Sequence, residues 1–398
     1  IHPHVPVEWP GGDYDVSARA GSRAAAAGGV TTFINFLIGE PGKTRKRYDE
    51  FRSALETASH VDFSFHLGVF TDKQIEMVPE FVDEGITSFK IFLPYRGEEV
   101  VEPLVGVDDG IVYKLMEAVA AVDTPARVLV HPENVEPSFK IKRDMRATGE
   151  WEDKGAITWA HVRPDFLEVD AINRISLFAE ETGCPTHFVH MSSAAGVEAF
   201  RDNRARYEVD LTAEAQVQYL TEDAREHNLL AKVNPPIRTA AEHDALWDGV
   251  RRGEISFLDS DHAPCATEHK ENIWEATVGI PNLQTWFPLV LTAVLDGGHL
   301  TLPQLVEATS YNPAAHYGLT PRKGGLWPGA DADVVIVDPE QRTTIRSEDM
   351  EDQSDFTPFE GREFATPEVT IARGEVVYRD GQILGNEGRG EFLPRPVK

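Results

Sequence analysis

The chain has 398 residues, 41% of them hydrophobic, and its 66 acidic and 38 basic side chains give a net charge of −28. This charge argues against a nucleic-acid partner, because phosphate binding requires a basic surface. The longest apolar run, residues 286–295, is far shorter than the roughly 20 residues of a membrane-spanning helix. We therefore expect a buried helix there and no membrane partner.

Short β-branched or aromatic runs alternate with amphipathic helical patterns along most of the chain. Helical spacing is clear at residues 48–58 and 171–183, and the second pattern ends in Gly183, a typical helix stop. The predicted strands cover residues 1–5, 30–37, 61–70, 87–93, 126–131, 185–191, 207–212 and 254–260. Eight strands alternating with helices predict an α/β protein whose parallel sheet closes into a (β/α)8 TIM barrel. An open doubly wound sheet is the alternative, but no Gly-rich phosphate loop supports it.

After about residue 320 the pattern changes to Gly/Pro-rich turns and alternating strands. Residues 368–384 predict a hairpin closed by Asp380-Gly381, and a polar loop at 346–363 separates the strands. We therefore predict a barrel domain at 1–320 and a small β-sandwich-like portion at 321–398. The N-terminal strands of that sandwich are expected to be absent from this chain, so the small part should pack on the barrel.

Six ionisable side chains lie on the predicted strands or at their ends. In a barrel, residues at the C-terminal strand ends converge on one mouth. A single strand histidine usually packs in the core, and a single aspartate after a strand usually caps a helix. The placement of all six residues on strands or at strand ends instead indicates one shared site. Lys90 would be costly to bury as a cation, so it needs a partner or a chemical change. The six are His2, His4, Lys90, His131, His190 and Asp261.

With these residues in place, the sequence resembles the cyclic-amide hydrolases of the amidohydrolase superfamily. Dihydropyrimidinases and hydantoinases are the most similar members, and dihydroorotases and allantoinases are close relatives. The shared motifs occur in family order over essentially the whole chain. They are His2-Pro3-His4, AAAAGGVTTFINF, FKIFLPY, VHPEN, FVHMSS, NPPIR, DSDHAP and GADADVVIVDP.

The resemblance implies two divalent metal ions, commonly zinc, bridged by N6-carboxylated Lys90. It assigns His2, His4 and Asp261 to one metal, and His131 and His190 to the other. A carbamate would convert the buried lysine cation into an anionic ligand with two oxygens. Imidazole and carboxylate ligands suit zinc.

The resemblance also implies the chemistry. A hydroxide held by the metals forms near neutral pH and attacks the ring carbonyl. Asp261 acts first as general base and then as general acid toward the leaving nitrogen. Tyr95 supports the developing oxyanion, and Asn234 and His262 are expected to contact the substrate.

The motifs disagree about which ring is opened. Tyr95 and the HPEN and SDFTPFEG motifs favour a dihydropyrimidine or hydantoin ring, whereas NPPIR, with Asn234, resembles dihydroorotases. Dihydroorotases place an arginine two residues after the second histidine to hold the substrate carboxylate, but this chain has Pro6 there. An allantoinase remains an alternative that the motifs do not exclude. The alternative from another class is a non-catalytic dihydropyrimidinase-related scaffold protein, which intact ligands argue against.

Other expectations concern the surroundings of the site. His66 and His187 are expected to pack or face outward, and Glu214 and Gln216 to lie on the loop after strand 207–212. The two cysteines offer no disulfide framework, which fits a cytoplasmic location. The family resemblance implies a small-molecule substrate and a homo-oligomer, either a dimer or a tetramer.

Overall fold

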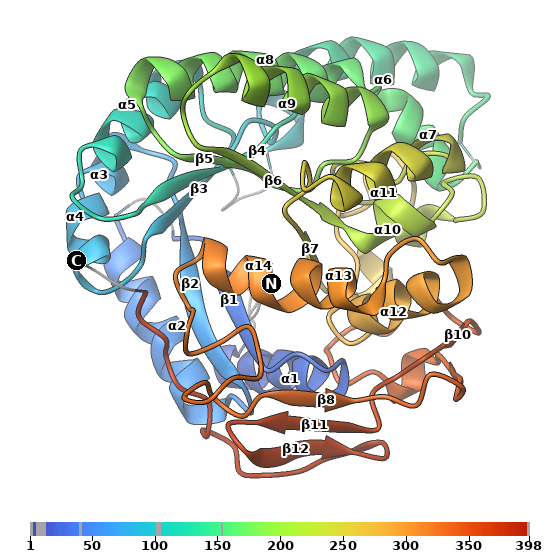
Figure 1. Cartoon of the computed structure of the whole chain (residues 1–398). Coiled ribbons are helices and arrows are strands. Elements are labelled where there is room, and N and C mark those ends of the chain that lie inside the picture. The colour runs from blue at the N-terminus through green and yellow to red at the C-terminus, as the bar shows by residue number, and fades with distance from the viewer. Residues whose placement is uncertain (1–2, 5–12, 40–41, 101–104, 153, 396–398) are drawn as a thin grey trace.

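The centre of the molecule is a curled parallel sheet with helices around its outside (Figure 1). The computed structural model describes residues 3–4, 13–39, 42–100, 105–152 and 154–395. The sheet's strands follow one another in chain order, and nearly all their residues are buried because helices cover the outer face. They are β1 (Thr32–Leu37), β2 (Asp62–Gly68), β3 (Ser88–Phe92), β4 (Arg127–His131), β5 (Thr186–Phe188), β6 (Leu211–Gln216) and β7 (Phe257–Asp259).

Pro3 and His4 lie between the first and last strands of this sheet. Pro3 forms a parallel bridge with His262, just beyond β7, and the His4 N–H donates to the His262 carbonyl at 2.8 Å. On the other side, the Phe36 N–H of β1 donates to the Pro3 carbonyl at 3.1 Å. This described part of predicted strand 1–5 therefore closes the sheet, and the predicted (β/α)8 barrel is confirmed.

The helices follow the predicted amphipathic patterns. Patterns 48–58 and 171–183 fall in α2 (Thr44–Ala58) and α8 (Phe166–Thr182), and the apolar run forms the largely buried α12 (Trp286–Gly297). The other α-helices are α1 (Tyr14–Ala27), α3 (Asp72–Ile75), α4 (Val78–Asp83), α5 (Asp109–Ala120), α6 (Glu136–Thr148), α7 (Ala156–Val162), α9 (Ala194–Arg206), α10 (Val217–Thr221), α11 (His243–Arg251), α13 (Leu302–Val306) and α14 (Asn312–His316). Short turns are η1 (Gly97–Glu99), η2 (Leu229–Ala231), η3 (Ala240–Glu242), η4 (Thr267–His269), the π-helical η5 (Glu307–Tyr311) and η6 (Ser347–Asp349). Among the helices described, none has the length and apolar character needed to cross a membrane.

The seventh predicted strand is placed wrongly by four residues. The prediction was 207–212, but β6 runs from Leu211 to Gln216. The N–H groups of Glu208 and Val209 each donate to the Glu180 carboxylate at 3.1 Å and join no strand. Glu214 and Gln216, expected on the following loop, lie inside β6 with 0% exposure, and these buried polar residues disguised the strand.

A four-stranded antiparallel sheet, in the order β13-β12-β11-β8, follows the barrel and lies beside α1 in Figure 1. The predicted hairpin is a meander with two turns. Arg373-Gly374 and Asp380-Gly381 have φ values of 47°, 79°, 48° and 80°, as tight hairpin turns of this twist require. The Asp380-Gly381 turn is thus confirmed, and the Arg373-Gly374 turn was missed. The C-terminal strands are β8 (Val334–Ile336), β9 (Thr343–Thr344), β10 (Glu363–Phe364), β11 (Val369–Ala372), β12 (Glu375–Arg379) and β13 (Gln382–Ile383).

The small sheet shares its apolar core with the barrel. One cluster of buried hydrophobic side chains runs from Ala18 to Val377. Beyond the sheet, the chain returns to the barrel, where Phe392 bridges Phe63 of β2 and the Arg395 N–H donates to the Gly85 carbonyl at 2.9 Å. The small part therefore packs on the barrel, while the division at 320/321 stays a prediction.

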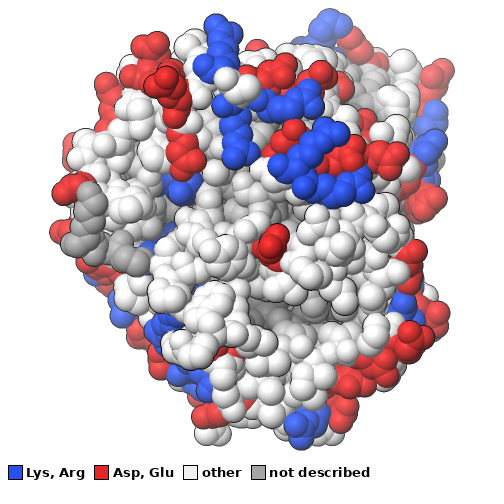
Figure 2. Space-filling model, in the orientation of Figure 1, with Lys and Arg blue, Asp and Glu red and all other residues white. Residues whose placement is uncertain are grey.

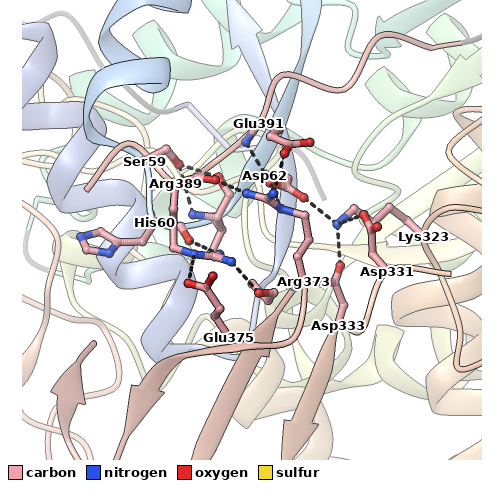
Figure 3. A network of polar contacts seen from close by, with 12 residues as sticks. Ser59, His60, Asp62, Lys323, Asp331, Asp333, Arg373, Glu375, Arg389 and Glu391 are labelled. Atoms are coloured by element: carbon pink, nitrogen blue, oxygen red, sulfur yellow. Dashed lines mark hydrogen bonds and ion pairs between the residues drawn. The ribbon is translucent and has the colours of Figure 1, made fainter. Parts of the chain in front are cut away.

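Buried ion pairs also join the barrel to the C-terminal part (Figure 3). Asp62, at the start of β2, is fully buried, and its two oxygens lie 2.7 Å from Lys323 Nζ and 3.1 Å from Arg373 Nε. Lys323 Nζ is also 3.0 Å from Asp331 and 2.8 Å from Asp333. Buried Lys323 and partly buried Arg373 thus share one buried carboxylate of the barrel.

Asp62→Asn is expected to lower the free energy of unfolding by roughly 2 kcal/mol, because it removes a buried carboxylate that accepts charged hydrogen bonds from both Lys323 and Arg373. Asp72→Asn is the matched control: Asp72 forms an exposed ion pair with Lys114 at 2.9 Å, and such pairs contribute about 1 kcal/mol or less. Denaturant titration of both variants measures the difference. Equal stability losses would contradict the role given to the buried network.

Acidic side chains lie in several separate groups on the one face of the molecule that Figure 2 draws. On the face shown in Figure 2, acidic side chains lie mostly around the periphery, interspersed with Lys and Arg, and mostly uncharged side chains occupy the middle. Charge dispersed in this way hydrates the surface as a whole. The view shows no single acidic patch.

Candidate active site

Three of the predicted site residues have an unusual backbone conformation. Among the described non-glycine residues, positive φ occurs at Tyr95 (62°), His190 (46°) and Asp261 (46°), and otherwise only in the two hairpin turns. A non-glycine residue in this region costs on the order of 1–3 kcal/mol, and it persists where the surrounding structure enforces it. These three residues follow β3, β5 and β7. The strained positions therefore mark the C-terminal mouth of the barrel, where sites are built in this fold.

His4 and Asp261 form the first pair of donors. His4 Nε2 lies 3.4 Å from Asp261 Oδ1, and both side chains are partly open to solvent, at 17% and 13% exposure. The His4 ring stacks on Phe36 with centroids 5.0 Å apart. His2 and Pro6 lie outside the described residues.

His131 and His190 form the second pair. Their ring centroids are 4.1 Å apart, and the two residues are 2% and 1% exposed. Burial lowers the pKa of His131 to about 4, so its imidazole is neutral at pH 7, the form that binds metals. Glu133 Oε2 lies 2.6 Å from His131 Nε2. Because a carboxylate can only accept, Nε2 carries the hydrogen and Nδ1 keeps its lone pair.

Lys90 lies between the two pairs. Its Nζ is 4.8 Å from the ring centroids of both Phe36 and Phe92. Phe36 stacks on His4, and the Phe92 ring centroid is 6.1 Å from that of His131. Burial lowers the pKa of the Lys90 amine to about 8, against the opposing effect of nearby carboxylates. No carboxylate in the described ranges forms an ion pair with it.

Tyr95 and Asn234 lie side by side, with Tyr95 next to His131. The Trp159 Nε1–H donates to Asn234 Oδ1 at 2.8 Å, which fixes the orientation of the amide and leaves its NH2 group to hydrogen-bond the Tyr95 oxygen. The Tyr95 ring centroid is 5.8 Å from that of His131. Burial raises the pKa of Tyr95, so its hydroxyl stays protonated and can donate a hydrogen bond.

His262 is fully buried next to Asp261. Its Nδ1 accepts from the N–H groups of Asn282 and Leu283 at 3.0 and 3.1 Å, so the hydrogen resides on Nε2. Burial lowers the pKa of His262 to about 3, which keeps the ring neutral. Within the part of the chain that is described, Nε2 has no hydrogen-bond partner. The Nε2–H of His262, next to Asp261, is therefore a hydrogen-bond donor without a partner among the described residues.

The donors suit a pair of divalent ions. Neutral imidazole and carboxylate are the ligands that zinc takes in hydrolases. In the described ranges, His, Cys, Asp and Glu side chains do not gather in groups of three that could hold an ion. The two pairs would thus need Lys90, and His2 outside the described residues, to complete them.

Sequence reasoning missed the polar groups behind the second pair. Glu133 contacts His131, and Arg163 lies 2.9 Å from Glu133. Burial alone would raise the pKa of Glu133, but Arg163 and His131 outweigh it and lower that pKa to about 2. Glu133 had one available signal, its position two residues after a histidine at a strand end. Arg163 stands in a loop with no signal of its own. As for His66 and His187, both are fully buried and hydrogen-bonded, to Ser88 and Thr212.

A closed barrel with histidine, aspartate and lysine at the mouth is the arrangement of a barrel hydrolase. The chain belongs to the Amidohydrolase family, whose sequence model matches residues 2–377. The allantoinase of Rubrobacter xylanophilus is 33% identical over 406 residues, covering 100% of this chain and 87% of that protein. A D-phenylhydantoinase of Escherichia coli is 32% identical over 395 residues, covering 94% and 82%.

Solved structures agree with this assignment. The D-hydantoinase (dihydropyrimidinase) of Thermus sp. superposes with a TM-score of 0.87 at 30% identity, covering 99% of this chain and 86% of that one. The L-hydantoinase (dihydropyrimidinase) of Arthrobacter aurescens gives 0.88 at 27% identity, covering 99% and 88%. The resemblance stated from the sequence motifs is thereby confirmed.

Proposed function

We propose that this enzyme hydrolyses the cyclic amide bond of a dihydropyrimidine or hydantoin-type ring. The observation that carries the proposal is the placement of Lys90 between the His4–Asp261 and His131–His190 pairs. The relatives named as hydantoinases and dihydropyrimidinases support this substrate class.

The proposal includes two divalent ions, with zinc favoured by the donor types. His2, His4 and Asp261 would hold one ion, His131 and His190 would hold the other, and carboxylated Lys90 would be a ligand shared by both. When bound, the ions would supply a water of pKa near 7 and a Lewis acid for the ring carbonyl. Neutral His131, with its lone pair on Nδ1, is prepared for this role.

The protein's own side chains then move the protons and hold the ring. Asp261 takes a proton from the attacking water and passes it to the ring nitrogen as the C–N bond breaks. The Tyr95 hydroxyl donates to the carbonyl oxygen as negative charge develops there, while Asn234 holds the Tyr95 oxygen in place. The Nε2–H of His262 is a further donor for the substrate.

Allantoin is the second candidate substrate. The allantoinase of Rubrobacter xylanophilus matches the whole chain at 33% identity, as strongly as the phenylhydantoinase relatives do. Allantoin is itself a hydantoin ring bearing a ureido group, so the same chemistry would open it. Dihydroorotate is less well matched, because Pro6 stands where an arginine would hold its carboxylate.

The substrate is tested by ring opening with zinc-loaded protein on hydantoin, dihydrouracil, allantoin and dihydroorotate at matched concentrations. The proposal predicts the highest kcat/KM on the first two and little on dihydroorotate. Preference for allantoin would select the second candidate. Preference for dihydroorotate would contradict the interpretation of Pro6, and inactivity on all four rings would favour the scaffold alternative.

Location and assembly belong to the same proposal. We infer a cytoplasmic enzyme, and both cysteines are buried free thiols, which fits a reducing compartment. A homo-dimer or homo-tetramer is the assembly expected from the family resemblance. Sedimentation velocity of the purified protein tests it, and a monomer would contradict it.

A further inference from the structure

Arg163 is fully buried at the C-terminal end of α7, between two carboxylates. Its Nη1 lies 2.9 Å from Glu133 Oε2, and its Nη2 forms an ion pair with Glu99. The two acid side chains are only 1% and 8% exposed. A planar guanidinium presents its donors to two carboxylates as a rigid fork, whereas the donors of a lysine ammonium rotate about a single point charge. The three side chains therefore form a buried cluster of ion pairs in the interior.

The first connection of this cluster leads through Glu133 to His131. The Glu133 oxygen that faces Arg163 is also 2.6 Å from His131 Nε2. That contact fixes the ring rotation and keeps the hydrogen on Nε2, so the lone pair of Nδ1 points away from Glu133. A carboxylate behind a histidine is the usual device for orienting a metal ligand.

The second connection leads through Arg238 to Ser192, in the segment that follows His190. The Arg163 carbonyl accepts from Arg238 Nη1 at 2.9 Å, and Arg238 Nε donates to Ser192 Oγ at 3.2 Å. Ser192 stands two residues after His190, and its N–H donates to the buried Glu168 carboxylate at 2.8 Å. The segment after His190 is thus linked to the backbone carbonyl of Arg163, whereas His131 is linked to the Arg163 side chain through Glu133.

The third connection leads toward Tyr95 and Asn234, the residues proposed to contact the substrate. Glu99 belongs to η1, four residues after Tyr95, and the Arg163 guanidinium carbon lies 5.3 Å from the centroid of the Trp159 ring. Trp159 in turn donates to Asn234 at 2.8 Å.

We propose that Arg163 is a positioning residue whose guanidinium holds His131, through Glu133, in the geometry for binding the second metal ion. The role rests on the proposed function, because it concerns the metal centre of that same site. Arg163 itself touches neither the substrate nor the reacting atoms. A purely structural ion triad could lower stability when broken and leave metal affinity unchanged, so the two roles are separable by experiment.

The test is a zinc titration of metal-free Arg163→Met, with a competing chelator to obtain affinities. Arg146→Met is the matched control, since Arg146 is half exposed and pairs with Glu275 at 2.9 Å. Wild type and Arg146→Met are expected to bind two equivalents tightly. Arg163→Met is expected to keep one tight equivalent and to bind the other about 10- to 100-fold more weakly. Arg163→Lys should recover only part of the loss.

Two tight equivalents in Arg163→Met, with only a lower melting temperature, would overturn the proposal. If that variant does not fold, Glu133→Gln carries the test, because its amide can donate as well as accept and no longer fixes the His131 tautomer. Wild-type zinc affinity in a folded Glu133→Gln variant would overturn the proposal equally. Fewer than two equivalents in the wild type would instead contradict the metal centre itself, and the role of Arg163 with it.

Discussion

Lys90→Ala is expected to lower kcat/KM for ring opening by at least about 10³-fold, because a metal pair contributes several kcal/mol to the transition state. Lys90 Nζ lies 4.8 Å from each of the aromatic rings that border the two donor pairs. Without its carbamate, nothing in the proposed site bridges those pairs. Steady-state kinetics with zinc-loaded protein on hydantoin measures the loss.

Lys114→Ala is the control for this variant, because Lys114 is 58% exposed and pairs only at the surface with Asp72. Formate or acetate should restore part of the activity of Lys90→Ala, since either anion offers the two oxygens of the missing carbamate in the space left by the side chain. Chloride at the same ionic strength should restore nothing. Full activity in Lys90→Ala without additives would contradict the bridging role.

Asp261→Asn is expected to lower kcat by about 10²- to 10⁴-fold, the contribution of a positioned general acid–base group. Asparagine keeps the size of the side chain but can neither accept the proton of the water nor return it to the ring nitrogen. The expected change in KM is small, because Asp261 is given no part in holding the ring. Kinetics at saturating and limiting substrate separate the two parameters.

Asp296→Asn serves as the control, since Asp296 is 62% exposed and pairs with Arg342 at 2.8 Å, outside the proposed site. Zinc content must be measured in both variants, because Asp261 is also a proposed ligand. A twofold change in kcat for Asp261→Asn, with zinc retained, would remove it from proton transfer. Another group would then have to carry the proton.

The barrel and the mouth residues could be predicted because both depend on local patterns. Apolar strands ending in His131 and His190 are visible as short runs, and a closed parallel sheet brings such ends together. Lys90 could also be recognised from the local pattern, because it lies within an apolar run and the burial of a cation there requires an explanation. The strained backbone at Asp261 and Tyr95 could not be predicted, because it is enforced by surrounding contacts.

Contacts between distant segments account for most of what the sequence did not reveal. The strand predicted at 207–212 alternates in polarity, yet its first residues bond to Glu180 and the real strand carries buried Glu214. Arg163 meets Glu99 and Glu133 across loops separated by 64 and 30 positions, and no periodicity links them. Such side chains become recognisable only when the fold places them together.

The most direct test of a two-metal ring-opening site is a titration of metal-free protein with zinc while hydantoin ring opening is followed. We expect no turnover without metal, a rise in activity as zinc is added, and a plateau once two equivalents are bound. Turnover by the metal-free protein, or none at two bound equivalents on any of the four rings, would contradict this expectation.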